Sequence, residues 1–364
     1  VRWMTIKLSE LAGAAVDSLR RAIHHCHWTR CGTGQCMSGQ EFRPATSWQG
    51  RVADRLLRTF VKPTIARVPI NRRVMKFSQL GFDTVTLALP VHADVHVAPA
   101  DAGGVPGEWL MTGRNLISGR VVLYFHGGAY FFGSPRSHRA LTWRLSRACR
   151  AKVLALNYRQ PPDWHYPAPL DDAIAAYKSL LAQGYSPENI VLAGDSAGGN
   201  LVLVTLLRLR ELKLPLPSCG VLISPWTDLS CTGETFASNA DAEPMLPVNA
   251  IRFAAASYSA RESVRDPLIS PVYADLTGLP PLLVQVGSTE VLLSDAQRIA
   301  ENAQRDGVSC RYQVWENMMH VFHVLAAWLP EAQLAIAEIG AFVEAKIAAA
   351  GGEQAVRRRA RLVS

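Results

Sequence analysis

Hydrophobic positions along the chain follow two periods, and the two alternate regularly after about residue 82. Short runs that are apolar at consecutive positions predict strands buried on both faces of a sheet. Longer runs with apolar residues three or four positions apart lie between them and predict helices. The expected strands are 84–89, 121–125, 152–157, 190–193, 220–224, 282–286 and 311–315, and the expected helices are 138–150, 170–183, 197–212, 294–306 and 331–348.

This alternation predicts an α/β fold in which a central, mostly parallel sheet is covered by helices on both faces. Two regions interrupt it: residues 37–80, which are rich in Arg and Val, and residues 226–266, which carry helical stretches between Pro-containing turns. We expect both to form a helical cap over the edge of the sheet. The catalytic domain is then expected to span residues 81–350, followed by a basic tail at 351–364.

Composition narrows the choice of partners. The chain has 364 residues, 49% of them hydrophobic, which is enough for one large core. The formal net charge of +8 includes the basic run Arg357, Arg358, Arg359 and Arg361. We interpret this run as solvated and expect no nucleic-acid partner, because no aromatic residues interleave with it. No run of about 18 apolar residues is present and the N-terminus lacks a secretory pattern, so we expect a cytoplasmic protein without stable membrane insertion.

Residues 1–36 are an N-terminal extension of uncertain standing. Met37 opens a segment that reads like an ordinary bacterial N-terminus, so we expect the residues before it to be dispensable or to be upstream translation. Residues 24–36 contain His and Cys, but no second paired half completes a tetrahedral zinc site, so no metal is expected. The seven cysteines are an odd number in mostly apolar contexts, which predicts reduced thiols.

The strongest local signal is GDSAGG at residues 194–199, which follows an expected strand and opens an expected helix. A strand-to-helix turn this tight exposes the hydroxyl of Ser196 at the C-terminal edge of the sheet. The first turn of the helix has free amides, so the N–H of Ala197 is expected to stabilise an oxyanion. Gly127 and Gly128 follow another expected strand and are the other candidate donors.

A serine hydroxyl is a weak nucleophile at neutral pH and needs a base within hydrogen-bond reach. In this type of fold the chain order is serine, acid and then histidine. His320 satisfies that order, because it follows the last expected strand by a short loop. His323 is the competing candidate, although we expect it to begin the final helix.

The acid that orients the histidine is expected just after the preceding strand. Glu290 lies in that loop, where its carboxylate would hold the imidazole and stabilise its protonated form. Asp295 is an alternative, although its place at the start of an expected helix also suits the helix dipole. Asp266 is a more distant alternative.

Several motifs together resemble those of the bacterial hormone-sensitive-lipase-like (family IV) carboxylesterases, over about residue 80 to the C-terminus. They are HGGAY at 126–130, GDSAGG at 194–199, DPLISP at 266–271, GSTE at 287–290 and MHVFH at 319–323. The resemblance implies the α/β-hydrolase fold with a helical cap. It also implies an oxyanion hole on Gly127 and Gly128, with Ala129 in place of a third glycine, and a triad of Ser196, Glu290 and His320.

The resemblance extends to a scaffold segment and to the substrate pocket. NYRQPPDW at residues 157–164 is similar to the family's YRLAPE stretch, and its Tyr158 and Arg159 are expected to support the HGG loop. Four aromatic residues near the site are candidates for lining the acyl pocket, with packing in the core as the alternative. They are Tyr130, Phe131, Phe132 and Trp226.

These residues predict a serine carboxylester hydrolase that acts on small-molecule esters of short or medium acyl chains through an acyl-enzyme, without metal or organic cofactor. A lactone or an acetylated natural product is an alternative substrate for the same triad. A catalytically silent ligand-binding protein on the same fold is the alternative of another class, although such proteins typically lack the histidine. By analogy with similar enzymes, a homodimer paired through an edge strand is a further expectation.

Overall fold

The computed structural model describes residues 40–45, 47–63, 91–113 and 116–363, with side chains as far as residue 350. The expected extension at 1–36, its His and Cys cluster and the expected strand 84–89 lie outside the described residues. The segment 64–80, expected as part of the cap, also lies outside them.

The centre of the fold is a nine-stranded sheet with the order β1-β9-β8-β7-β6-β4-β5-β3-β2. The strands from β1 to β5 in this order pair in parallel, whereas β3 is antiparallel to both β5 and β2. The expected mostly parallel sheet is therefore confirmed. The strands are β1 Gln40–Arg43, β2 Val95–Asp101, β3 Pro106–Thr112, β4 Val121–Phe125, β5 Lys152–Leu156, β6 Ile190–Asp195, β7 Cys219–Ile223, β8 Leu282–Gly287 and β9 Cys310–Trp315.

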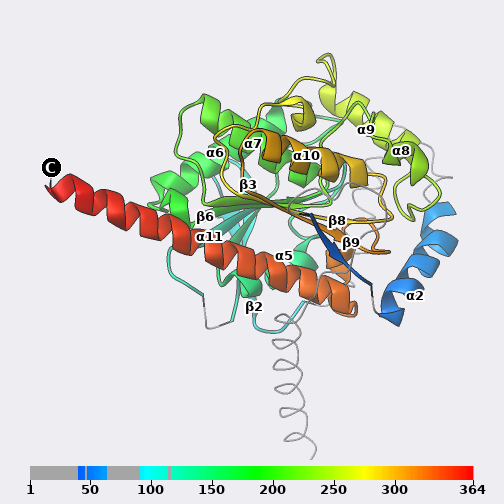
Figure 1. Cartoon of the computed structure of the whole chain (residues 1–364), viewed down its shortest axis with the longest axis horizontal. Coiled ribbons are helices and arrows are strands. Elements are labelled where there is room, and N and C mark those ends of the chain that lie inside the picture. Colours follow the sequence, from blue (N-terminus) through cyan, green and yellow to red (C-terminus); the bar gives the residue numbers. More distant parts are fainter. Residues whose placement is uncertain (1–39, 46, 64–90, 114–115, 364) are drawn as a thin grey trace, which may run out of the picture. The chain divides into compact units, whose positions relative to one another are not determined.

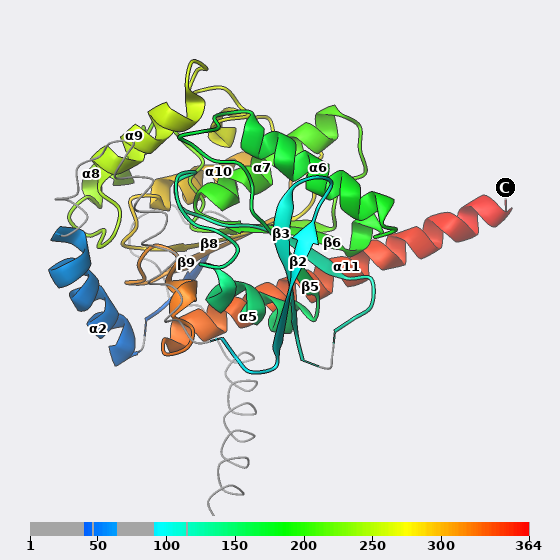
Figure 2. The ribbon, with the colours of Figure 1, turned by 180° about the vertical axis from the view of Figure 1, so that it is seen from behind.

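Helices cover both faces of this sheet, as Figures 1 and 2 show from opposite sides. On one face lie α6 (Ala168–Ala182), α7 (Ala197–Glu211) and α10 (Leu293–Arg305), and on the other lie α5 (Arg139–Cys149) and α11 (Pro330–Val363). The last two pack so closely that a Cβ at Gly340 would overlap the carbonyl oxygen of Ala148. Residues 351–363, which we expected as a tail, continue α11.

The insertion after β7 carries two short helices, α8 (Thr235–Ser238) and α9 (Val248–Ser259). Near it lies α2 (Trp48–Leu56), which runs into a π-helical stretch at Leu57–Val61. Arg58 donates to the carbonyl oxygens of residues 241 and 242, and Lys62 to those of residues 240 and 241. The two regions that we expected to form a cap therefore contact each other.

The expectation that the whole of residues 37–80 is cap is wrong at Gln40–Arg43. This segment is β1, which pairs in parallel with β9 and extends the sheet. Its side chains reinforce the pairing, because Glu41 accepts hydrogen bonds from Arg311 at 2.7 Å and from Gln313 at 2.9 Å. The strand was hidden in the sequence because its four residues, QEFR, are mostly polar.

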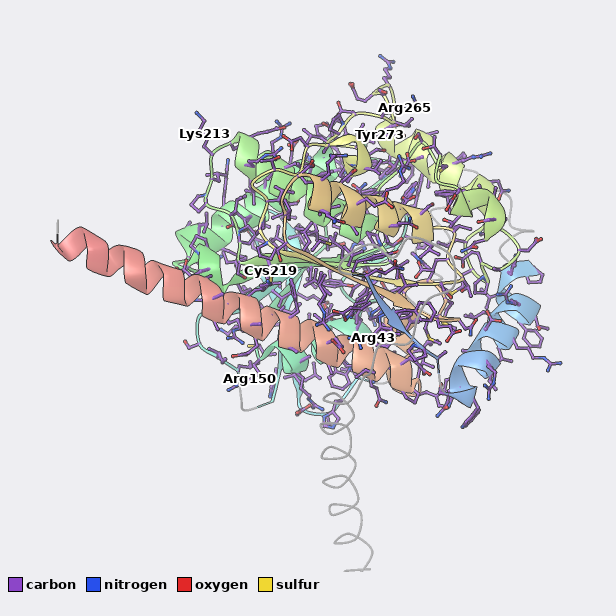
Figure 3. All side chains as sticks on the ribbon, in the orientation of Figure 1. Arg43, Arg150, Lys213, Cys219, Arg265 and Tyr273 are labelled. Atoms are coloured by element: carbon purple, nitrogen blue, oxygen red, sulfur yellow. The ribbon has the colours of Figure 1, made fainter. Side chains whose placement is uncertain are left out.

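The cysteines of the described chain agree with the expectation of reduced thiols. Cys149, Cys219, Cys231 and Cys310 are free, and Figure 3 shows Cys219 in the middle of the molecule. Burial raises the pKa of Cys149 and of Cys219 to about 12, so both thiols stay protonated at neutral pH. Among the described helices, none has both the length and the apolar character needed to cross a bilayer.

Candidate active site

Ser196 lies at the sharp turn between β6 and α7, with φ 55° and ψ −119°. A non-glycine residue in this region is strained by about 1–3 kcal/mol, so the surrounding chain must hold it. The amide of Ser196 donates to the carbonyl of Ile223 at 2.8 Å. The turn also requires glycine at 194 and 198, because a Cβ there would overlap Gly198 O and Phe125 O respectively. This is the geometry that presents a serine hydroxyl at the edge of the sheet.

His320 and Glu290 form a buried hydrogen-bonded pair, with 2.8 Å between Nδ1 and Oε2. The other carboxylate oxygen of Glu290 accepts from the Gly287 amide at 2.6 Å and from the Ser224 hydroxyl at 2.7 Å. Ser224 Oγ in turn accepts from the amide of Val321 at 3.2 Å. Ser224 therefore links residues 288–292, which carry Glu290 and which we call the acid loop, to the loop at residues 316–321, which carries His320. Nothing in the sequence indicated this role, although Ser224 is a polar residue directly after the apolar strand β7.

The protonation state of His320 follows from its surroundings. Burial alone would lower its pKa, but the hydrogen bond and charge of Glu290, with the charges of Glu243 and Asp195, raise the pKa above its usual value. Because Nδ1 faces the carboxylate, the proton of the neutral ring lies on Nδ1 and Nε2 is the basic nitrogen. The site therefore favours the imidazolium that proton abstraction would create.

His323, the competing base, has a different environment. It is buried in the 3₁₀ helix Phe322–Leu325. The expectation that it begins the final helix is wrong, because that helix starts at Pro330. Its Nε2 lies 2.8 Å from Oε1 of Gln285 in β8. Burial lowers the pKa of His323 to about 3, so its imidazole is neutral and donates within the core. These contacts assign His323 to packing.

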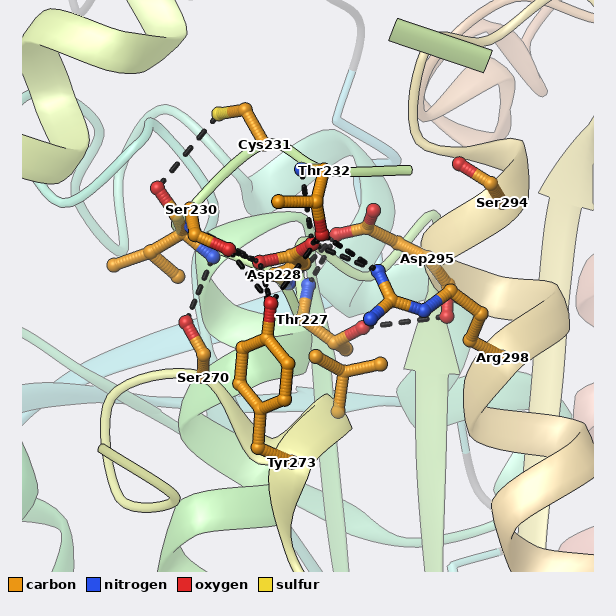
Figure 4. A network of polar contacts seen from close by, with 12 residues as sticks. Thr227, Asp228, Ser230, Cys231, Thr232, Ser270, Tyr273, Ser294, Asp295 and Arg298 are labelled. Atoms are coloured by element: carbon orange, nitrogen blue, oxygen red, sulfur yellow. Dashed lines mark hydrogen bonds and ion pairs between the residues drawn. The ribbon is translucent and has the colours of Figure 1, made fainter. Parts of the chain in front are cut away.

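The alternative acids also make other contacts. Asp295 accepts the amides of Thr227 and Asp228, both at 2.8 Å, in the polar network of Figure 4. Burial, together with the charge of Asp228, raises the pKa of Asp295 to about 8. Asp266 accepts the amide of Leu268 at 2.8 Å. Neither carboxylate is hydrogen-bonded to His320, whereas Glu290 is.

The HGG loop is held by Asp195, the residue before the serine. Its Oδ1 accepts the amide of Gly127 at 2.9 Å and the hydroxyl of Tyr124, and its Oδ2 lies 3.5 Å from Nε2 of His138. Burial opposes ionisation, but the charge and hydrogen bond of His138 and the hydrogen bond of Tyr124 lower the pKa of Asp195 to about 2. This role of the Asp195 carboxylate was not expected from the sequence.

The hydrogen bond to Asp195 contradicts the expectation that Gly127 donates to an oxyanion, because its amide is already engaged. The amides of Gly128, Ala129 and Ala197 have no hydrogen-bond partner in the described part of the chain. Gly128 has φ 118°, Ala129 has φ 53° and Tyr130 has φ 63°, so the loop carries three consecutive residues with positive φ there. Such a backbone can direct successive amides to one point.

Tyr158 supports this loop, as the resemblance implied. Its hydroxyl donates to the carbonyl of His126 at 2.6 Å, and the two rings stack with 4.4 Å between centroids. Arg159 makes neither this hydrogen bond to the His126 carbonyl nor this stacking contact. It pairs with Asp172 at 2.6 Å, which anchors the segment to α6.

Three of the four aromatic candidates for the pocket are packing residues. Tyr130 is buried, stacks on Tyr258 with 3.8 Å between centroids and donates to Asn200 at 2.7 Å. Trp226 is 1% exposed and Phe131 is 2% exposed. Phe132 is only partly buried, so it is the one of the four whose environment is consistent with lining a cleft.

No group of His, Cys, Asp and Glu that could hold a metal ion occurs among the described residues. The arrangement instead combines a strained serine, a carboxylate-oriented imidazole and free amides. These are the parts that acyl transfer requires.

Comparisons with known proteins give the same assignment. A family profile described as "alpha/beta hydrolase fold" matches residues 122–324. An acetyl-hydrolase of Streptomyces hygroscopicus is 45% identical over 250 residues, 68% of this chain and 83% of that protein. An esterase of Acinetobacter venetianus is 35% identical over 261 residues, 71% of this chain and 86% of that protein.

The same relationship is visible in three dimensions. The crystal structure of an esterase from the bacterial hormone-sensitive lipase family has a TM-score of 0.78 at 40% identity, covering 83% of this chain and 99% of the other. The order of the motifs, the buried acid-base pair and these matches agree. The chain belongs to the alpha/beta-hydrolase-fold family and, within it, to the bacterial hormone-sensitive-lipase-like carboxylesterases of family IV.

Proposed function

We propose that this carboxylic ester hydrolase uses Ser196 as nucleophile, His320 as general base and Glu290 to orient the base. The observation that carries the proposal is the 2.8 Å hydrogen bond between His320 Nδ1 and Glu290 Oε2. It fixes the tautomer whose Nε2 can accept the serine proton. The strained turn at Ser196 supports the proposal, because such strain is typical of a positioned nucleophile.

The first half of the reaction forms an acyl-enzyme. Ser196 Oγ attacks the ester carbonyl while Nε2 of His320 takes the hydroxyl proton, and Glu290 stabilises the imidazolium. The amides of Gly128, Ala129 and Ala197 donate to the oxyanion of the tetrahedral intermediate. This intermediate collapses when the ester C–O bond breaks and His320 gives its proton to the departing alcohol.

The second half regenerates the enzyme. Water attacks the acyl carbonyl as His320 takes one of its protons, and the same three amides bind the second oxyanion. The bond to Ser196 Oγ breaks, the proton returns to this oxygen and the carboxylic acid leaves. Every proton and leaving group is accounted for by the triad and water, so the chemistry has no further requirement.

We propose esters of short or medium acyl chains as substrates. The name acetyl-hydrolase of the Streptomyces relative supports a small acyl group. The burial of Tyr130 and Phe131 supports it too, because these large side chains fill space at the end of the HGG loop. Hydrolysis of p-nitrophenyl acetate and butyrate is therefore expected to exceed that of the palmitate ester.

The test is the release of p-nitrophenol from acetate, butyrate, octanoate and palmitate esters by the wild type and single variants. Ser196→Ala and His320→Ala are expected to lower kcat by roughly 10³ or more, and Glu290→Ala by about 10² or more. His323→Gln is the matched control for His320→Ala and is expected to stay within about tenfold of the wild type. Turnover by Ser196→Ala equal to that of the wild type would refute the assignment.

A further inference from the structure

A second buried carboxylate lies near the acid-base pair and has no part in the mechanism above. Glu243, in the loop between α8 and α9, is 1% exposed. Its Oε1 accepts the amides of Met245 at 2.8 Å and Leu246 at 3.3 Å, which are in its own loop. Its Oε2 accepts the amide of Val291 at 3.2 Å. Because Val291 directly follows Glu290, this carboxylate bonds to the backbone of the acid loop.

Asn239 holds the same loop at a second point. Its side-chain amide donates to the carbonyl oxygens of Ser288 at 3.1 Å and Glu290 at 2.8 Å. The amide of Glu243 donates to the carbonyl of Asn239 at 2.7 Å, so the two residues belong to one turn. We call residues 239–243 the clamp turn. It bonds to the acid loop before, at and after the catalytic carboxylate.

The clamp turn is itself held from its other side. Arg58 Nη1 donates to the carbonyl of Asp241 at 2.6 Å, and Arg58 also donates to the carbonyl of Ala242. Lys62 Nζ donates to the carbonyl of Ala240 at 2.9 Å. The turn therefore connects the α2 region with the acid loop, and its three middle carbonyls are fixed by cations while Asn239 and Glu243 contact the acid loop.

The charges around His320 show what the carboxylate of Glu243 adds. The negative groups that act on His320 are Glu290, Glu243 and Asp195, while the charge of His320 helps to lower the pKa of the neighbouring His323. The charge of Glu243 is among the influences that raise the pKa of His320. Burial, reinforced by the charge of Glu290, raises the pKa of Glu243 itself, while His320 opposes that change.

We propose that Glu243 is a positioning residue that, together with Asn239, fixes the backbone of the acid loop and places a second negative charge beside the His320–Glu290 pair. This inference rests on the proposed function for its catalytic meaning. Two negative groups near the imidazole favour the imidazolium that forms in each half-reaction. Asn239 supplies position without charge, so the two contributions can be separated.

The experiment measures the pKa of His320 directly and activity independently. The pKa is followed by NMR titration of protein with ¹³C-labelled histidine, with the His320 resonance assigned by its loss in His320→Gln. In Glu243→Gln the pKa of His320 is expected to fall by about 0.5 unit or more. The midpoint of the acid limb in the pH profile of kcat/KM for p-nitrophenyl butyrate is expected to shift to lower pH by the same amount. Glu243→Asp keeps the charge and is expected to restore both toward the wild-type values.

Two further variants separate charge from position. Asn239→Ala is expected to lower kcat by about tenfold without moving the pKa of His320. Glu331→Gln is the matched control, because the buried carboxylate of Glu331 also holds a segment of backbone outside the sheet. It accepts hydrogen bonds from the amide of Ser47 at 2.9 Å and from the hydroxyl of Ser47 at 2.7 Å. It is expected to lower the melting temperature and to leave the pKa of His320 and kcat as in the wild type.

An unchanged His320 pKa in Glu243→Gln would overturn the electrostatic role, and kcat within about twofold of the wild type in both Glu243→Gln and Asn239→Ala would overturn the positioning role. Failure of the proposed function looks different, because the wild type would then hydrolyse no ester or Ser196→Ala would match it. The NMR titration still decides the effect of Glu243 in that case. If Glu243→Gln does not fold, Glu243→Ala removes the same charge and is titrated in its place, and Asn239→Ala still tests the positioning role.

Discussion

The HGG loop and the acid loop are held in place by different parts of the molecule. The HGG loop is bonded to Asp195, which adjoins the nucleophile, and to Tyr158 at the end of β5. The acid loop is bonded to Ser224 in the sheet layer but also to the clamp turn in the insertion between β7 and β8. The proposed oxyanion donors are therefore tied to the strand that precedes Ser196, whereas the His320–Glu290 pair also depends on a segment outside the sheet.

Substitutions that affect the support of the HGG loop and substitutions in the clamp turn should therefore change activity in different ways. A change in the support of the HGG loop also disturbs the strand that carries Ser196, because Asp195 is part of β6. A change in the clamp turn reaches the reaction only through Glu290 and His320. We therefore expect the first kind of change to reduce kcat most strongly. The second kind should reduce kcat less and should alter the pH dependence only where the charge of Glu243 is lost.

Among changes to the residues that support the two loops, the largest effect is expected for Gly127→Ala. A Cβ at this position would overlap Oδ2 of Asp195, so the loop must shift and its amides move from the oxyanion position. We expect kcat to fall by about 10³, as for the loss of an oxyanion-hole donor. The measurement is steady-state hydrolysis of p-nitrophenyl butyrate.

Gly119→Ala is the control for this prediction. Gly119 has φ 79° and no atom within 4 Å of an added Cβ, so alanine there costs only backbone strain of about 1–2 kcal/mol. We expect a lower melting temperature and an unchanged kcat. Equal kcat values for Gly127→Ala and the wild type would show that the loop tolerates displacement, and the comparison between the two loops would fail.

A smaller effect is expected for Asp195→Asn, which keeps an acceptor for the Gly127 amide but removes the charge. We expect kcat to fall by about 10-fold to 100-fold, with little change in KM. Asp172→Asn is the control, since Asp172 is also buried and pairs with Arg159 away from the loop glycines. It should lower stability and leave kcat unchanged, and an equal loss of kcat in both variants would contradict a specific role for Asp195.

The same carboxylate also predicts a pH dependence of stability. The pKa of Asp195 is about 2 in the folded chain and 3.8 in its ordinary state, so its ionised form stabilises the fold above about pH 4. This contribution, about 2 kcal/mol, is lost as the pH falls from about 4 to 2. Denaturant unfolding at pH 7 and pH 3 should therefore show a smaller difference in Asp195→Asn than in the wild type.

The strands that the sequence predicted well are those buried on both faces, such as β4, in which every residue is buried. β2 and β3 were missed because most of their residues are exposed or only partly buried, and both strands contain proline. Hydrophobic patterning depends on burial, so it detects the central strands and overlooks the less buried strands at or beside the edges of the sheet.

The candidate site also has a part that the sequence predicted and a part that it did not. The positions of Ser196, Glu290 and His320 follow from local motifs and from their order along the chain. The engagement of the Gly127 amide depends on a carboxylate 68 residues away, and the contact of Glu243 with Val291 spans 48 residues. No local sequence pattern predicts such hydrogen bonds, because each partner alone resembles an ordinary loop residue.

The smallest effect on activity is expected for Asp295→Asn, which tests whether the acid loop's neighbours in Figure 4 serve stability alone. The pKa of Asp295 is about 8 in the folded chain against an ordinary 3.8, so the folded state holds a proton that the unfolded state releases. Stability must then fall as the pH rises from about 4 to 8. Asparagine imitates the protonated form and removes this loss.

We therefore expect the melting temperature of the wild type to fall between pH 6 and pH 9 by roughly 5 °C more than that of Asp295→Asn, with kcat within about threefold. Glu301→Gln is the control, because this exposed carboxylate lies on the same helix, α10. Differential scanning calorimetry at the two pH values makes the comparison. A large loss of kcat in Asp295→Asn would instead show that Asp295 acts on the acid-base pair, and that the clamp turn is not the main external support of Glu290.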